Sequence, residues 1–262
     1  MPKPYVIAFA NQKGGVGKTT SCVNIASIAA EKGLRVLLVD SDPQGNSTSG
    51  VGIRKRGISH SAYDVLIDEA DPADCVVKTA FKNLSVVPST LELAGAEIEL
   101  LDTERRERRM ASFLEKCGDD FDLAVIDCPP SLSLLTVNAL TAADSVVIPM
   151  QCEYYALEGL IQLMLSIRRV KELYNPSLTV LGILITMYNG RLTLTSAVLD
   201  EIKKHYADKL FKTVIPRAVR LTEAPGFGEP INYHDRYSKA CEAYAAATDE
   251  ILSRIGLPGA KA

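Results

Sequence analysis

Short apolar runs alternate with longer stretches of helical spacing along most of the chain. The apolar runs are rich in β-branched residues and cover residues 5–10, 35–39, 84–87, 123–126, 145–149 and 178–186. Continuous runs of this length are typical of strands that are covered on both faces, as in a parallel sheet. The helical stretches cover residues 19–32, 91–101, 132–142, 157–174, 194–205 and 239–254. This alternation predicts an α/β fold with a doubly wound, mostly parallel sheet and helices on both faces.

The chain is expected to fold as one domain over residues 1–262. No Gly/Ser-rich or Pro-rich linker divides it, and no internal repeat is visible. The first strand begins within a few residues of Met1, which leaves no room for an N-terminal helix-turn-helix. We expect residues 256–262 to fray, because this tail contains two glycines and a proline.

Composition narrows the classes of function. The net charge of −3 gives no global attraction to nucleic acid or anionic lipid, so such binding needs a local basic patch. The six cysteines lack C-x-x-C and zinc spacings, and each is expected to be a buried apolar residue. No run of about 18 apolar residues is present, and Lys13 and Lys18 interrupt the first apolar stretch. We therefore expect a cytoplasmic protein that is not inserted in a membrane.

Residues 13–20 read KGGVGKTT and fall between the first predicted strand and the first predicted helix. This is the structural context of a phosphate-binding P-loop. Gly14, Gly15 and Gly17 lack a Cβ, so the backbone N–H groups of this turn, Val16 included, can approach phosphate oxygens closely. The positive N-terminal end of the following helix adds to the attraction for phosphate.

Side chains of the same segment add metal and charge chemistry. Lys18 can reach the outer phosphates, and the hydroxyl of Thr19, which precedes Thr20, can ligate Mg²⁺. The first glycine of the usual G-x-x-x-x-G-K-[ST] pattern falls on Gln12, so the match is to K-G-G-x-G-K-T, with a second lysine at Lys13. That lysine can neutralise charge in a phosphoryl transition state. The alternative is that Lys13 is a solvated charge before a Gly-rich turn.

Two predicted strands end in acidic residues. Asp40 and Asp42 follow the run 35–39, and Asp127 follows the run 123–126. Carboxylates at the C-terminal ends of parallel strands point into the ligand crevice. Each of them alone could cap a turn. Beside a P-loop lysine we interpret them as groups that handle Mg²⁺ and water, because nucleotide phosphates arrive with a metal.

Three motifs together resemble those of the deviant Walker P-loop NTPases. They read KGGVGKT, LLVDSDPQGN and VIDCPPS. Within that group the chain is similar to the ParA/Soj chromosome-partition branch, on the segments QCEYYALEGL, TMYNGR and IPRAVRLTEAPGFGEPI. The resemblance covers almost the whole chain, and the length fits the short, chromosomal-type members.

The resemblance implies an ATPase that uses ATP and Mg²⁺ and forms a homodimer around two ATP molecules. In this family the first lysine of the motif, here Lys13, crosses the interface to the partner's ATP. Asp42 would position the attacking water, and Asp40 and Asp127 would support Mg²⁺ through water. ATP would favour the dimer and loss of the γ-phosphate would weaken it, because a ligand shifts an equilibrium only by its differential affinity.

The resemblance also places the adenine base and a DNA contact. Asn189 and Pro216 lie where similar proteins hold the base, and Arg217 and Arg220 lie where they carry DNA-binding arginines. Two positions depart from the family pattern, since many relatives have Asp where Asn189 stands and Asn where Ala218 stands. Fewer matching residues therefore support the adenine and DNA contacts than support the phosphate site.

DNA binding would be independent of sequence, because no base-reading motif is present. Arg191, with Lys203, Lys204 and Arg236, would extend the patch, and scattered solvated charge is the alternative for all of these residues. Joining two patches in one dimer raises avidity and makes DNA binding depend on ATP. The resemblance thus implies a nucleoid-associated ATPase that moves ParB-bound chromosome or plasmid DNA, with the positioning of another cargo as an alternative. Its hydrolysis, weak alone, would be stimulated by DNA and a ParB-type partner.

Several residues of interest have no assigned role. Residues 153–155, Glu-Tyr-Tyr, directly follow a predicted strand and would shape the dimer or nucleotide edge, and packing explains the tyrosines equally well. His60, His205 and His234 show no partner spacing and are expected at the surface or in local hydrogen bonds.

Three rival interpretations share the phosphate chemistry. A MinD-like membrane ATPase should end in a basic amphipathic helix, whereas this sequence ends ATDEILSRIGLPGAKA, with acids at Asp249 and Glu250. A reductase like the nitrogenase iron protein needs two cluster-binding cysteines per subunit, and neither Cys117 nor Cys128 lies in a Gly-rich loop. A nucleotide-gated scaffold without turnover is disfavoured by Asp42.

Overall fold

One mostly parallel sheet organises the computed structural model, which describes residues 3–154 and 156–258. The strand order is β3-β4-β2-β5-β1-β6-β7, and within it only the β3–β4 pair is antiparallel. The strands are β1 (Tyr5–Phe9), β2 (Val36–Asp40), β3 (Val77–Lys78), β4 (Leu84–Val87), β5 (Leu123–Asp127), β6 (Ser145–Met150) and β7 (Thr179–Ile185). All six predicted strands are confirmed, and the two-residue edge strand β3 is the addition.

The six helices that helical spacing predicts are present, within about two residues at most ends. They are α1 (Lys18–Glu31), α5 (Leu93–Glu99), α7 (Leu134–Ala142), α8 (Ala156–Leu173), α9 (Thr193–Tyr206) and α12 (Lys239–Ile255). The remaining helical elements were not predicted: α2 (Asn46–Gly50), α3 (Ala62–Ile67), α4 (Pro72–Cys75), α6 (Arg109–Lys116), α10 (Arg220–Phe227), α11 (Ile231–His234) and the 3₁₀ turns η1 (Leu100–Asp102), η2 (Arg106–Arg108) and η3 (Gly118–Asp120).

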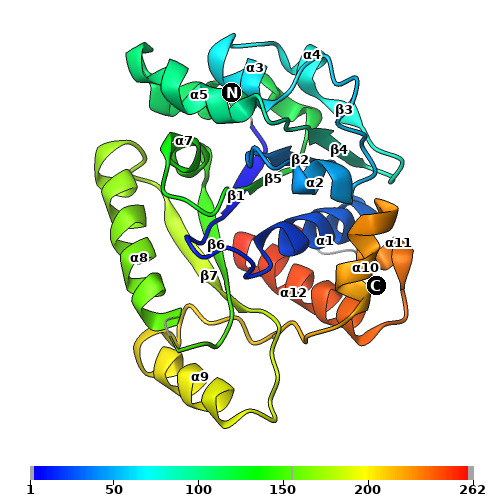
Figure 1. Cartoon of the computed structure of the whole chain (residues 1–262), viewed down its shortest axis with the longest axis vertical. Helices are drawn as coiled ribbons and strands as arrows, with labels where there is room; N and C mark the ends of the chain where they lie inside the picture. The colour runs from blue at the N-terminus through cyan, green and yellow to red at the C-terminus, as the bar shows by residue number, and fades with distance from the viewer. Residues whose placement is uncertain (1–2, 155, 259–262) are drawn as a thin grey trace.

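Two apolar cores flank the sheet, one on each face. Along β1, Val6 and Ala8 belong to one core and Ile7 and Phe9 to the other, and all four are fully buried. This two-sided burial is the reason that the strands read as continuous apolar runs. Helices α3, α5, α6, α7, α8 and α9 cover one face, and α1, α11 and α12 cover the other (Figure 1). The predicted α/β architecture, with helices on both faces, is confirmed.

Local backbone chemistry sets the ends of the two helices nearest the site. Helix α1 follows Gly17, whose φ of 81° is a left-handed conformation that disfavours other residues. Ser238 caps the start of helix α12, since its side chain accepts a hydrogen bond from the Cys241 amide at 3.2 Å. Gly256, with a φ of 72°, caps the end of this helix. Residues 259–262 of the predicted fraying tail lie outside the described residues.

The cysteine and histidine predictions are confirmed. All six cysteines are buried and unpaired. His60, His205 and His234 each approach a nearby acid, at Asp64, Glu201 and Glu229 respectively. Across the described part of the chain, no helix has the combined length and apolarity that crossing a bilayer requires.

Candidate functional site

The carboxyl ends of the central parallel strands bring the predicted residues to one edge of the sheet. Asp127, the last residue of β5, is in register with Phe9 of β1 on one side and with Asp40 of β2 on the other. The P-loop leaves β1 next to this pair and leads into α1. Figure 1 shows this loop and the start of α1 lying over the ends of the central strands. The two acids and the loop therefore share one crevice, as expected for a ligand site of an open α/β sheet.

Lys18 is almost fully buried at the start of α1, with 6% of its surface exposed. Its Nζ donates to the backbone carbonyl oxygen of Lys13 at 3.1 Å. Burial lowers the pKa of the Lys18 amine, and the charges of Asp127 and Asp42 act against this shift. A buried cation at the positive N-terminal end of a helix attracts an anion.

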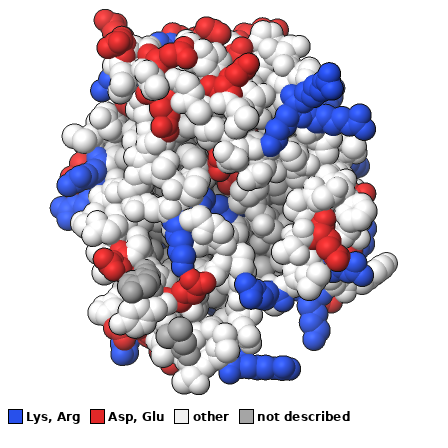
Figure 2. Space-filling view, in the orientation of Figure 1, with Lys and Arg blue, Asp and Glu red and all other residues white. Residues whose placement is uncertain are grey.

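Lys13 lies at the rim of the same crevice. Its backbone amide donates to the Asn11 side chain at 3.0 Å, which fixes the start of the loop. Its ammonium forms an ion pair with Glu153 of the same chain, and both side chains are about half exposed, at 46% and 49%. Figure 2 shows basic and acidic side chains meeting near the centre of this face. The Lys13 ammonium is therefore a half-exposed surface charge that is paired with an acid in this conformation. Tyr155 lies outside the described residues.

Asp40 is fully buried and is tied to the short helix α2. Its Oδ2 accepts hydrogen bonds from the backbone amide and the hydroxyl of Thr48, both at 2.7 Å, and its Oδ1 accepts one from the Asp42 amide at 3.2 Å. Burial, and then the charge of Asp127, raises the pKa of the Asp40 carboxyl. The hydrogen bonds from Thr48 oppose that shift without cancelling it.

Asp127 is equally buried and contacts both α1 and α2. Its Oδ2 accepts a hydrogen bond from the Ser47 hydroxyl at 2.7 Å, and the Thr19 hydroxyl also hydrogen-bonds to this carboxyl. Burial raises the pKa of Asp127 despite these donors. The neighbouring Ser41 hydroxyl is buried and has no hydrogen-bond partner among the described residues. Asp127, Thr19 and Asp40 are oxygen donors, the kind of ligand that Mg²⁺ prefers.

Protein side chains alone do not form a closed metal site. Within the described residues, no cluster of three or more His, Cys, Asp or Glu side chains is arranged to hold an ion. Mg²⁺ usually keeps several waters and binds through one or two carboxylates together with substrate phosphates. The donors at this edge, Asp127 and the Thr19 hydroxyl, fit that mode of binding and not a dedicated cage.

Asp42 has a partly structural role. Its Oδ1 accepts a hydrogen bond from the Gln44 amide at 2.9 Å, so the carboxylate caps the turn that leads into α2. Only 8% of the residue is exposed. The capping role and a role toward water are compatible, because a carboxylate has four acceptor positions.

A cavity of about 300 Å³ opens beside the P-loop. Its walls come from the P-loop, the ends of β6 and β7, the segment before α10, and α12: Gly15, Gly17, Thr20, Gln151, Thr186, Met187, Ile215, Pro216, Arg217, Ala218, Leu221, Thr222 and Tyr244. Pro216, which the family resemblance places near the base, lines this cavity. The Asn189 side chain is exposed instead, and its Oδ1 accepts a hydrogen bond from the Arg191 amide at 3.2 Å.

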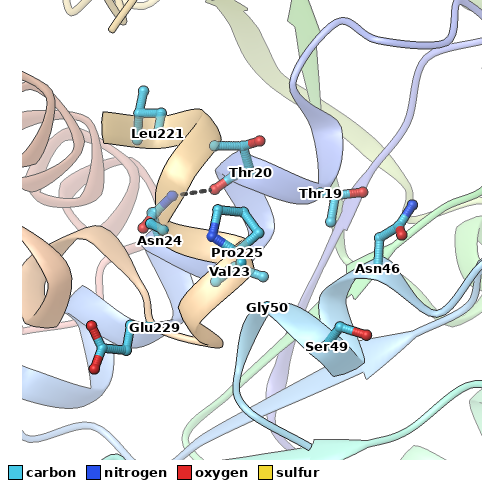
Figure 3. A pocket seen from close by; sticks show the side chains of 12 residues that line it. Thr19, Thr20, Val23, Asn24, Asn46, Ser49, Gly50, Leu221, Pro225 and Glu229 are labelled. Carbon is cyan, nitrogen blue, oxygen red and sulfur yellow. Dashed lines mark hydrogen bonds between the residues drawn. The ribbon is translucent and has the colours of Figure 1, made fainter. Parts of the chain in front are cut away.

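A second cavity, of about 450 Å³, lies between α1, α2 and α10 (Figure 3). It shares Thr20 and Leu221 with the first cavity but contains no P-loop glycine. Its walls come from α1, α2 and α10: Thr19, Thr20, Val23, Asn24, Asn46, Ser49, Gly50, Leu221, Ala224, Pro225, Gly226 and Glu229. Gly52 and Gly228, which follow α2 and α10, pack closely, since a Cβ on Gly228 would lie 2.8 Å from the Gly52 Cα.

The three predicted DNA-binding arginines are exposed. A parallel bridge between Tyr188 and Pro216 lays the loop that carries Arg191 beside the segment that carries Arg217. Arg220, at the start of α10, approaches two acids, with Glu223 at 2.9 Å and Asp235 at 3.4 Å. Figure 2 shows basic side chains around and below α10, while acidic side chains gather at the opposite end, over α5.

Four residues of the site were missed from the sequence. Ser47 and Thr48 bind the two buried carboxylates, and Gln151 and Thr186 bind the P-loop backbone. A usable signal existed for the second pair. Both residues directly follow a strand, β6 or β7, and the strand-end rule that selects the acids would select them as well.

Comparison with known proteins gives consistent family matches. The sequence profile described as AAA domain matches residues 4–180. The sporulation initiation inhibitor protein Soj of Bacillus subtilis is 53% identical over 248 residues, which are 95% of this chain and 98% of that protein. The chromosome partitioning protein ParA of Caulobacter vibrioides (strain NA1000 / CB15N) is 47% identical over 251 residues, which are 95% and 94% of the two chains.

Solved structures share the fold. Cobyrinic acid a,c-diamide synthase from Mycobacterium smegmatis, with bound ADP and magnesium, superposes with a TM-score of 0.85 at 37% identity, over 97% of this chain and 96% of that chain. The septum site-determining protein MinD of Pyrococcus horikoshii, complexed with Mg-ADP, gives 0.80 at 24% identity, over 97% and 98%. At 24% identity, the similarity to MinD supports the fold alone.

Proposed function

The chain belongs to the Soj/ParA family of chromosome-partitioning ATPases, and from this premise we propose that Mg-ATP joins two copies into a dimer that binds DNA without sequence specificity. Hydrolysis, stimulated by DNA and a ParB-type partner, then releases the DNA. The observation that carries the proposal is the position of Lys13, a half-exposed ammonium at the rim of a phosphate crevice. ATP and Mg²⁺ are the cofactors.

The phosphate end of ATP fits the P-loop. Lys18 would bind the outer phosphates once its amine leaves the Lys13 carbonyl, and the N–H groups of the loop would bind the others. The base would enter the 300 Å³ cavity lined by Pro216, because that cavity opens directly from Gly15 and Gly17. The 450 Å³ cavity has no P-loop glycine in its wall, which makes it the poorer choice for the nucleotide.

Hydrolysis would depend on the acids at the ends of β2 and β5. Asp42 would orient a water toward the γ-phosphate, since water positioning is the main task of a side chain in this chemistry. Asp127, Thr19 and, through water, Asp40 would hold Mg²⁺, which neutralises charge on the phosphates. Their hydrogen bonds to Ser47 and Thr48 tie this chemistry to α2.

Charge explains why a dimer would need Lys13. Two ATP molecules between two subunits bring like charges together, and cations inserted from each side offset that repulsion. The ion pair of Lys13 with Glu153 lies at the surface, where pairs of this kind are weak. Lys13 is therefore free to leave it for a stronger anion on a second subunit.

DNA contact would come from Arg217 and Arg220, extended by Arg191. All three are exposed, and Arg217 also lines the 300 Å³ cavity proposed for the base, so a DNA contact there would lie next to the ligand that gates it. One such patch binds DNA weakly, in the non-specific range of about 10⁻⁴–10⁻⁶ M, and two patches in a dimer bind far more tightly.

Two rivals are less well supported. A MinD-like membrane role requires an amphipathic helix with a free apolar face, whereas the apolar face of α12 is buried, with Tyr244 and Ile251 in the core beside α1. A cluster-binding reductase requires accessible thiolates, whereas burial raises the pKa of Cys128 far above its usual value and that of Cys117 to about 12.

Sedimentation with and without Mg-ATP tests the dimer. The wild type is expected to shift from monomer to dimer with ATP, and Lys13→Ala is expected to bind ATP yet remain monomeric. Lys116→Ala, on the remote helix α6, is the matched control and should behave as the wild type. ATP-dependent dimers of Lys13→Ala would refute the role of this lysine.

Duplex binding at fixed salt tests the DNA patch. The double variant Arg217→Glu/Arg220→Glu is expected to lose ATP-dependent DNA binding while it still forms the ATP dimer. Arg168→Glu, an exposed arginine on α8, makes the same kind of charge change away from the patch. Intact binding by the double variant would show that the patch lies elsewhere.

A further inference from the structure

Two side chains from outside the P-loop bind consecutive carbonyl groups of its backbone. The Thr186 hydroxyl donates to the Val16 carbonyl oxygen at 2.7 Å, and the Gln151 Nε2 donates to the Gly15 carbonyl oxygen at 2.8 Å. Thr186 and Val16 are buried, with 2% and 1% exposed. The first of these bonds is therefore protected from water, and a carbonyl deprived of it there would be left unpaired.

Peptide geometry converts these two bonds into an orientation of N–H groups. In a planar trans peptide, the carbonyl of one residue and the N–H of the next point in opposite directions. No cis peptide occurs among the described residues. Fixing the Gly15 carbonyl therefore fixes the Val16 N–H, and fixing the Val16 carbonyl fixes the Gly17 N–H. Both N–H groups point away from the side chains that hold the carbonyls.

We propose that Gln151 and Thr186 are positioning residues that aim the Val16 and Gly17 N–H groups at a bound phosphate. They act through the backbone and do not touch the nucleotide phosphates themselves. The proposal rests on the phosphate site proposed above, and it adds two residues to that site. The loop has little rigidity of its own, because Gly14, Gly15 and Gly17 have no Cβ to restrict their backbone conformation.

The sheet gives these two side chains a rigid base. Thr186 and Gln151 are the first residues after β7 and β6, and the Thr186 amide donates to the Met150 carbonyl at 2.8 Å. Gln151 Nε2 also contacts the Met187 sulfur at 2.9 Å. Met187 has a left-handed φ of 49°, a conformation that persists in a non-glycine residue only where its surroundings enforce it.

The same residues form part of the cavity assigned to the base. Gln151, Thr186 and Met187 all line it, together with Gly15 and Gly17. A base in this cavity would pack against the side chains that hold the loop. Thr186→Val and Gln151→Leu keep an apolar packing surface there, so adenosine binding reports on the base contact separately from the phosphate contact.

Calorimetric titration of a hydroxyl-deletion series tests the proposal. Thr186→Val keeps the shape of the side chain and removes the donor, whereas Thr186→Ser keeps the donor. Losing one hydrogen bond to a neutral group corresponds to a roughly 2- to 13-fold change in an equilibrium. Thr186→Val is expected to bind MgADP more weakly by that factor and to bind adenosine, which carries no phosphate, as the wild type does. Thr186→Ser should stay within about twofold of the wild type.

Two further variants guard against a merely structural effect. Thr248→Val removes a buried hydroxyl-to-carbonyl bond of 2.8 Å in α12 and should leave MgADP affinity unchanged. Gln151→Leu, at a partly exposed position, removes the second bond with little cost in stability, and it should weaken MgADP alone. It preserves the test if Thr186→Val fails to fold.

The outcomes separate the two proposals. Equal losses of MgADP and adenosine affinity, or a Thr186→Ser variant as weak as Thr186→Val, would overturn the positioning role. So would unchanged MgADP affinity in both Thr186→Val and Gln151→Leu. If the wild type itself fails to bind MgADP, the phosphate site is wrong, and that result is distinguishable because no variant is involved.

Discussion

Lys13 cannot pair with Glu153 and reach the phosphates of a second subunit at the same time. The intramolecular pair therefore competes with the proposed dimer, since each chain must break its own pair before its lysine can cross. Glu153→Gln removes the competing charge while it keeps the size and the hydrogen-bonding capacity of the side chain. We expect this variant to form the ATP dimer more readily than the wild type.

The magnitude follows from the exposure of the pair. Both side chains are about half exposed, and pairs of this kind contribute about 0.2–1 kcal/mol each. A dimer breaks two of them, so the change in dimerisation free energy is about 0.4–2 kcal/mol, which is a roughly 2- to 30-fold lower dissociation constant. The effect should shrink at high salt, where exposed charges are screened.

Sedimentation equilibrium over a range of protein concentrations, with saturating Mg-ATP, measures this constant. Glu158→Gln, in the first turn of α8, removes an exposed acid five residues further on and should leave the constant unchanged. In a Lys13→Ala background, Glu153→Gln should not restore the ATP dimer, because the lysine that the pair withholds is absent. A Glu153→Gln variant that dimerises as the wild type does, or more weakly, would refute the competition.

Three further predictions concern the acids. Asp42→Ala should form the ATP dimer but hydrolyse ATP more slowly by roughly 10²–10⁴, and normal phosphate release would exclude it from the chemistry. Because the pKa of Asp40 is raised to about 7, the nucleotide-free folded state binds more protons than the unfolded state between about pH 4 and pH 7. The free energy of unfolding should therefore fall as pH rises through that window, and denaturation of Asp40→Asn should show a flatter slope; equal slopes would contradict this. Ser47→Ala removes a donor to Asp127 and should raise its pKa further, so the Mg²⁺ needed for half-maximal ADP binding should increase several-fold at pH 6 and little at pH 8. An unchanged requirement at pH 6 would count against Asp127 as a metal ligand.

Much of the fold was predictable because its signal is local. Each interior strand is buried on both faces, so a run such as Val36–Asp40 contains only apolar residues until the acid at its end. The short helix α2 gave no such signal. Its sequence, NSTSG, is polar and five residues long, and it is held by hydrogen bonds from Ser47 and Thr48 to buried acids. Such a helix is determined by its tertiary partners and not by its own periodicity.

The site was predictable where chemistry follows strand ends, and not where it depends on distant pairs. The strand-end rule selected Asp40 and Asp127, which do lie side by side. The pairing of Lys13 with Glu153 spans 140 positions, so no spacing in the sequence reveals it. Asn189 shows a different limit, because a motif position gives no information on whether a side chain faces a cavity or closes its own turn.

Three buried ionisable groups at the ends of the central strands have shifted pKa values. The pKa of Lys18 is lowered and the pKa values of Asp40 and Asp127 are raised, each chiefly by burial, so every one of these groups is less easily ionised than in water. In the proposed site, a metal nucleotide would supply counter-charges, with its phosphates beside the lysine and its divalent cation beside the acids. Part of its binding free energy would then be used to ionise Lys18, Asp40 and Asp127. The negative charge that Lys18 and the metal do not neutralise would lie on the outer phosphates, near the rim where Lys13 is located. A cation from a second chain would neutralise it.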